Sequence, residues 1–181
     1  MRYYRLTDDI NFPDRWYLCD MHDESMKYVH LSTLHMAKLI TAEISKEGVS
    51  MDFTTSDNNA IPIVTESLAK ALSREKNVMF IPTIINGNHD ENNYYTMVAT
   101  ESIDCVDEEK SEFTKFEVDD PVRPDRAGDY SGFFKLIIDK NKIVDKDIFR
   151  IEKSETRLIV SERIKNLLES EGFTGLKFKE V

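Results

Sequence analysis

The last third of the chain contains the stretch that decides its fold: Ile148-Phe149-Arg150-Ile151, a polar turn, and then Leu158-Ile159-Val160-Ser161-Glu162-Arg163. The first run predicts a short apolar strand. Ser161 predicts the N-cap of a helix, because its hydroxyl can accept a hydrogen bond from the free amides of the first turn. Apolar residues then recur at helical spacing, which predicts a helix with one buried face. A final strand ends at Val181.

An earlier stretch has nearly the same order. Met51-Asp52-Phe53 leads through a polar turn to Ile63-Val64-Thr65-Glu66, a predicted helix and a predicted strand over Val78–Ile81. A gap-free shift of 96 positions places Phe53 on Phe149 and Glu66 on Glu162. This self-similarity indicates an internal duplication. The alternative, that every strand–capped helix–strand unit looks alike, stays open.

These two stretches predict the fold class. We expect a single α+β domain over residues 1–181, with a mostly antiparallel sheet, a few packed helices and two similar strand–capped helix–strand units as its frame. A chain of 181 residues suits one domain of ordinary size, and its 40% hydrophobic content can bury a core. No linker, low-complexity tract or break in composition divides it.

Between the two units, the sequence predicts two strand pairs. Val78–Ile85 and Tyr94–Ala99 are expected to pair antiparallel across a polar loop that starts at Asn86-Gly87. Pro82 cannot donate a ladder hydrogen bond, which favours an edge position or a bulge. Phe133–Ile138 predicts a further strand, and a tight turn after it is expected to send Ile143–Val144 back.

Three segments before and beside the first unit have weaker patterns. The pattern favours a strand near Tyr28–Leu31 and a helix over part of Met36–Ser45. The run of Thr, Ser, Asp and Asn over Thr54–Asn59 predicts a loop.

The overall charge restricts the classes of partner. The formal net charge is −10 and the sequence pI is near 4.9. Binding to nucleic acid or to an anionic membrane surface is disfavoured, because phosphate groups require cationic side chains. A basic protein partner is favoured for the same reason.

The N-terminus and the cysteines indicate the compartment. Met1–Leu6 has no apolar run behind its charges, so no secretory signal is predicted. No apolar window is long enough to span a bilayer. Cys19 and Cys105 lie in no paired motif, which favours two reduced thiols. We therefore expect a soluble, cytoplasmic protein.

Four groups of residues, in order along nearly the whole chain, resemble the bacterial polymorphic-toxin immunity proteins of family eleven, formerly a domain of unknown function. The last group is the most specific, and the segment His22–Lys46 departs from the pattern. The groups are Tyr3-Tyr4-x-Leu6 with Trp16; Asp52-Phe53 with Ile61-Pro62-Ile63-Val64-Thr65-Glu66; Ile103-Asp104 with Ser111; and Ile148–Ile151 with Ile159–Arg163 and Thr174-Gly175-Leu176-x-Phe178.

The resemblance implies an inhibitor rather than an enzyme: a protein that binds a cognate toxin and neutralises it stoichiometrically. It implies no catalytic residues, no cofactor and no metal. The matching residues look structural, since they are caps, turns and core positions. The oligomeric state and the activity of the toxin stay open.

The segment Glu101–Asp129 contains eleven acidic residues and four basic ones, so it carries seven of the ten net negative charges. A solvated surface connection would explain such a run. The alternative is an acidic face that docks a basic toxin surface, since clustered charge speeds association and fixes register. Two phenylalanines in this segment could be apolar anchors or core. The expected partner-binding residues are Asp104, Asp107, Glu108, Glu109, Glu112, Phe113, Phe116, Glu117, Asp119 and Asp120.

Two other functions stay open. A metal-dependent hydrolase could use the loop around His89 with acids from Asp104 to Glu109. However, the ionisable residues of that loop are consecutive, and adjacent side chains rarely converge on one ion. An acidic adaptor protein without a toxin partner is the third alternative.

Overall fold

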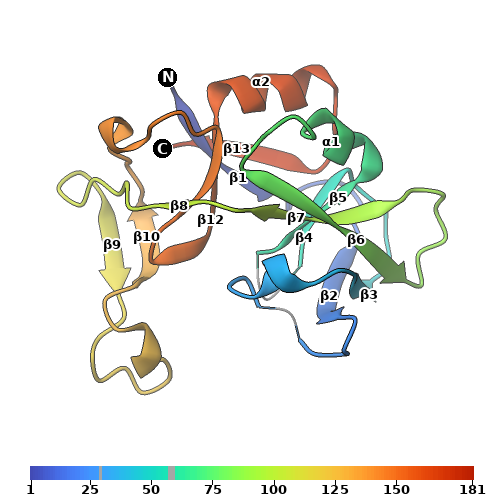
Figure 1. Ribbon diagram of the computed structural model, residues 1–181, viewed down its shortest axis with the longest axis horizontal. Coiled ribbons are helices and arrows are strands. Elements are labelled where there is room, and N and C mark those ends of the chain that lie inside the picture. Colours follow the sequence, from blue (N-terminus) through green and yellow to red (C-terminus); the bar gives the residue numbers. More distant parts are fainter. Residues whose placement is uncertain (29, 57–59) are drawn as a thin grey trace.

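The computed structural model describes residues 1–28, 30–56 and 60–181, and its strands form three sheets (Figure 1). The first sheet has five strands. They lie in the order β13 (Leu176–Glu180), β1 (Tyr3–Asp8), β12 (Ser154–Ser161), β11 (Ile148–Ile151) and β8 (Ser102–Ile103). All its pairs are antiparallel except β11 with β8. The first and last strands of the chain therefore lie side by side.

The second sheet has six strands and is also mostly antiparallel, with one parallel pair between its second and third strands. The strands lie in the order β2 (Tyr17–Asp23), β3 (Ile40–Lys46), β6 (Val78–Asn86), β7 (Tyr94–Ala99), β5 (Pro62–Thr65) and β4 (Phe53–Thr55). The third sheet contains only β9 (Glu112–Lys115) and β10 (Tyr130–Lys135).

Two α-helices follow strands of the two large sheets, α1 (Glu66–Ala71) after β5 and α2 (Glu162–Ser170) after β12. Three short 3-10 turns complete the regular structure of the described residues: η1 (Leu34–Met36), η2 (Pro124–Arg126) and η3 (Lys140–Lys142). The prediction of an α+β fold with mostly antiparallel sheets is confirmed.

One core joins the two large sheets. Leu68 of α1 and Ile164 of α2 are fully buried in it, together with Val64 of β5 and Val160 of β12. Both helices lie on the same side of the molecule, at the top of Figure 1. Because this core takes apolar side chains from both halves of the chain, neither half buries its helix alone.

The structure contradicts the helix predicted over part of Met36–Ser45. Only η1 is helical there, and β3 covers Ile40–Lys46. Ile40 and Ala42 are fully buried on one face, with the exposed Glu43 next to them, and β2 and β6 supply hydrogen-bonding partners on both sides. The alternation of buried residues therefore has the period of a strand, and tertiary pairing overrides the local helical pattern.

Three loop and strand predictions also need correction. Thr54 and Thr55 belong to β4 rather than to a loop, because they pair with β5, while 57–59 lie outside the described residues. In the segment Tyr28–Leu31, where a strand was expected, Tyr28 makes only an isolated bridge with His22, and Val29 lies outside the described residues. Ile143 follows η3 without forming a returning strand.

The predicted pair of β6 and β7 is confirmed, with Phe80 opposite Met97. Pro82 is exposed, and the pairing of β6 with β3 begins only at Thr83. At Pro82 the strand therefore has a partner on one side only, as a residue without an amide hydrogen requires.

Candidate functional site

The predicted partner-binding residues all lie in residues 104–139, which we call the acidic lobe. It contains β9, η2 and β10 and projects at the left of Figure 1, away from the six-stranded sheet. Cys105, Val106, Tyr130 and Ile138 of the lobe are buried against the five-stranded sheet, where Phe149 is fully buried. The lobe is thus anchored by an apolar base, and its charges lie beyond this base.

The two phenylalanines expected as anchors are packed within the lobe. Phe113 lies edge-on to Tyr130, with ring centroids 5.2 Å apart, and beside Phe133 at 6.2 Å. Phe116 is half-buried, and the guanidinium of Arg126 lies 4.9 Å from its ring centroid. Both half-buried rings therefore pack against other side chains of the lobe.

Three other apolar side chains of the lobe are free. Val118 is 85% exposed, Val122 78% and Phe134 78%. Sequence reasoning missed all three. The signal for Phe134 was available, because two consecutive phenylalanines in a strand point to opposite faces and this pair lies in a sheet of two strands. Exposed apolar side chains ringed by charge are typical of protein-binding surfaces.

Three of the lobe's eight predicted carboxylates already have partners. Asp107 accepts from Lys110 Nζ at 2.6 Å, and Glu108 accepts from Lys115 Nζ at 2.7 Å and from the Tyr130 hydroxyl at 2.6 Å. These bonds hold the pKa of both carboxyl groups below their ordinary values. Asp120 caps a turn, since it accepts from the backbone amides of Val122 and Arg123, which lowers its pKa as well.

The other acidic residues of the predicted set form no ion pair with any residue that the structure describes. They are Asp104, Glu109, Glu112, Glu117 and Asp119, and all are exposed. Glu117 and Asp119 flank the exposed Val118. The tip of the lobe, residues 117–122, therefore combines uncompensated negative charge with exposed apolar side chains.

The residues that carried the family resemblance make structural joints, by which we mean clusters of hydrogen bonds that connect segments far apart in the sequence. Asp52 accepts from the hydroxyls of Thr65 at 2.9 Å and Thr174 at 2.8 Å, and from the Thr174 amide at 2.8 Å. Phe53 N donates to Thr174 O at 3.1 Å. Two motif blocks that are far apart in the sequence thus close the same joint. Thr65 stands at the N-cap position, but its hydroxyl makes no cap hydrogen bond.

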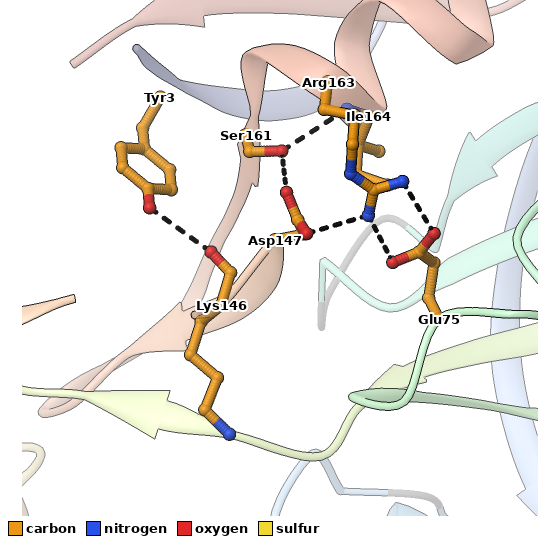
Figure 2. Close-up of polar contacts among 7 residues, drawn as sticks. All are labelled: Tyr3, Glu75, Lys146, Asp147, Ser161, Arg163 and Ile164. Atoms are coloured by element: carbon orange, nitrogen blue, oxygen red, sulfur yellow. Dashed lines mark hydrogen bonds and ion pairs between the residues drawn. The ribbon is translucent and has the colours of Figure 1, made fainter. Parts of the chain in front are cut away.

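A second joint lies at the start of α2 (Figure 2). The Ser161 hydroxyl donates to Asp147 and accepts from the Ile164 amide at 3.4 Å, which confirms the predicted cap. Arg163 donates to Asp147 at 2.8 Å and makes two bonds, at 2.6 and 3.1 Å, to Glu75, which follows α1. Burial would raise the pKa of Asp147, but the bonds from Arg163 and Ser161 outweigh it and lower that pKa.

The loop around His89 is a separate feature of the surface. His89 and Asp90 are exposed and line a hollow of about 350 Å³ together with Trp16. Asp90 accepts from the Tyr94 hydroxyl at 2.6 Å and from Asn88 at 2.8 Å, so it organises the loop. Across residues 1–28, 30–56 and 60–181, no group of three or more His, Cys, Asp or Glu side chains is placed to hold a metal ion.

Neither cysteine forms a disulfide with any described residue. Cys105 is buried in the base of the lobe, where burial raises its pKa to about 12. Cys19 is half-buried on β2. Among the described residues, no helix combines the length and apolar composition needed to cross a membrane.

A family model described as Immunity protein family (Imm11) matches residues 45–181. The match includes both helices and the whole acidic lobe but leaves out β1, which lies between β12 and β13. It begins near the end of the segment that departs from the family pattern in the sequence. A search of curated proteins finds no match.

Proposed function

The chain belongs to the Imm11 immunity protein family, and we therefore propose that it binds a cognate bacterial toxin and neutralises it by stoichiometric protein–protein inhibition. The family match over residues 45–181 carries this proposal. Inhibition by binding needs no catalytic residue and no cofactor from this chain. We place the protein in the cytoplasm, as one domain that meets its toxin there.

We propose the acidic lobe as the surface that docks the toxin. Its free carboxylates favour a basic toxin surface, and Val118, Val122 and Phe134 supply apolar contact. Charged groups of this kind raise the association rate, whereas buried apolar groups slow dissociation. The ten residues predicted from the sequence therefore have two roles. Those that already have a partner within the lobe maintain its shape. The unpaired carboxylates contact the toxin, together with the three exposed apolar residues.

The test of the function is to mix the purified protein with the toxin encoded beside its gene. We expect a stable complex of fixed stoichiometry and loss of toxin activity that is complete at molar equivalence. A folded protein that neither binds nor protects would overturn the proposal. Protection at amounts far below equivalence would instead indicate turnover, as in an enzyme.

We also propose that β4–β5–α1–β6 and β11–β12–α2–β13 are two copies of one unit. In each, an aspartate precedes a hairpin, and the last hairpin residue bonds back to it through both amide and hydroxyl: Thr65 to Asp52 and Ser161 to Asp147. In each sheet, one strand lies between the hairpin and the closing strand, β7 in one and β1 in the other.

The inserted strands also correspond. Tyr94 pairs with Thr65 in one sheet, and Tyr3 pairs with Ser161 in the other. The pairings refine the superposition made on sequence, because Phe53 and Ile148, rather than Phe53 and Phe149, hold the same register opposite Val64 and Val160. The connection from Arg150 to Leu158 in the second hairpin is thus one residue longer than the connection from Thr55 to Pro62 in the first.

A further inference from the structure

Two arginines lie on the face of the five-stranded sheet that also anchors the acidic lobe. Arg5 of β1 pairs directly with Ile159 of β12, so both side chains point to the same face. Arg157 lies two residues before Ile159 on β12 and points to that face as well. Ile159 is fully buried in the base of the lobe. The face that carries the lobe therefore continues into this arginine pair.

Neither guanidinium has a carboxylate partner among the residues that the structure describes. Among the ion pairs of the described residues, none involves Arg5 or Arg157, although the protein has a net charge of −10. The Nε atom of each is buried and makes no hydrogen bond. Within the described part of the chain, the Arg157 side chain donates only to the neighbouring Thr156 hydroxyl, at 3.0 Å. Buried donors without partners are costly, and a rotation of each half-buried side chain towards an acceptor outside the protein would remove that cost.

The two arginines also repel each other. Burial lowers the pKa of Arg5, and burial together with the charge of Arg5 lowers the pKa of Arg157 to about 10. Lys179 of β13 pairs with Arg5 and is exposed on the same face, which adds positive charge. Lys177 lies on this face too, 3.9 Å from the carboxylate of Asp9. An anion between the arginines would relieve the repulsion.

We propose that Arg5 and Arg157 form a site for an aspartate or glutamate side chain of the toxin. This inference rests on the proposed function. A guanidinium matches a carboxylate through two parallel hydrogen bonds. Arg5 and Arg157 are both half-buried, so each keeps some exposed surface that faces a partner. A protein carboxylate fits better than a nucleic acid phosphate, because the acidic lobe beside the site repels a polyanion. The site sets the register of the toxin, while the lobe attracts it.

The first experiment measures binding kinetics to the toxin for the wild type, Arg157→Gln and Arg5→Gln. Losing one partner of a buried ion pair weakens binding by on the order of 30-fold or more, mainly through faster dissociation. Lys179→Gln is the matched control, since it removes an exposed cation from the same face, and its affinity should change less than about threefold. Tight binding by the wild type with unchanged dissociation of both arginine variants would overturn the site and leave the proposed function intact.

The second experiment needs no toxin. Sulfate is the probe, and the unfolding temperature is compared in sulfate and chloride at equal ionic strength. Sulfate should raise the unfolding temperature of the wild type more than that of Arg157→Gln or Arg5→Gln. The unfolding temperature of Lys179→Gln should respond to sulfate as that of the wild type does. Both arginine variants should fold, because each removes a repelled, unpartnered donor. An equal response of all four proteins would contradict an oxyanion site at Arg5 and Arg157, whatever the toxin experiment shows.

Discussion

Gly175 leaves no room for a side chain. Its φ is +81°, and a Cβ atom there would lie 2.2 Å from the carbonyl oxygen of Phe53, a backbone atom that cannot move aside cheaply. The amide of Asp9, the residue after β1, also donates to Gly175 O at 2.8 Å, and Phe53 N of β4 donates to Thr174 O, so the turn is held at two points. The Thr174-Gly175 pair of the family pattern is thus explained by close backbone approach.

We predict that Gly175→Ala lowers the free energy of unfolding by roughly 3 kcal/mol or more, because it adds a clash to an unfavourable φ. Gly172→Ala is the matched control. Its φ is +72°, but nothing lies within 4 Å of a Cβ atom there, so only the conformational cost of about 1 kcal/mol applies. Urea denaturation of the two variants measures the difference. Equal losses would show that the backbone at Phe53 relaxes.

Asp147 is the carboxylate on which the α2 joint depends. Its folded-state pKa is below the ordinary value of 3.8, so its stabilisation is present above that pH and is lost as the pH falls through the folded-state pKa. We predict that Asp147→Asn costs about 1–3 kcal/mol at neutral pH, where Ser161 and Arg163 lose a charged acceptor. The difference from the wild type should shrink towards about pH 3, as measured by denaturant unfolding at both pH values. A difference that is independent of pH would contradict this role.

The two helices contribute to the fold through their buried faces and their caps rather than through length. α1 has 6 residues and α2 has 9, shorter than isolated helices that are stable in water. Leu68 of α1 and Leu72, the residue directly after it, correspond to Ile164 and Leu168 of α2. All four side chains are fully buried. Both helices therefore require an apolar side chain at each of these two positions.

If the two units are copies of one another, one helix should substitute for the other. We predict that a chain in which 66–75, with Ala69 retained, carry the sequence of 162–171 still folds. This exchange keeps apolar residues at 68 and 72, the buried Ala69 and a glutamate at 75 for Arg163. Circular dichroism and cooperative thermal unfolding test this. The control exchange shifts the inserted sequence by one position, which moves the apolar residues off the buried face and should prevent folding. Failure of both chains would argue against equivalent units.

For the molecule as a whole, the charge of the lobe tip should control the rate of encounter with the toxin. We predict that Glu117→Lys with Asp119→Lys slows association by about tenfold or more at low salt, with a smaller effect at high salt. Surface plasmon resonance at two ionic strengths measures both rates.

The control for the lobe tip reverses a charge that is already paired. Asp125 forms an ion pair with Arg123 at 2.8 Å and lies in the same lobe. Asp125→Lys with Arg123→Glu keeps the net charge and the pair, so association should stay as in the wild type. If the tip variant and this control associate equally fast with the toxin, the interface lies elsewhere on the protein.

The sequence by itself determined the family, the mostly antiparallel α+β class, the β6–β7 pair and the cap at Ser161, because these depend on residues that are close together or on patterns with a clear period. It also located the acidic segment, since net charge is additive along the chain. Tertiary structure alone decided the rest. It made Ile40–Lys46 a strand between two partners, packed Phe113 and Phe116 within the lobe and gave three of the eight predicted carboxylates a partner. Among the described residues, it left Arg5 and Arg157 without an ion pair. These outcomes depend on neighbours distant in sequence, and burial and pairing are properties of those neighbours.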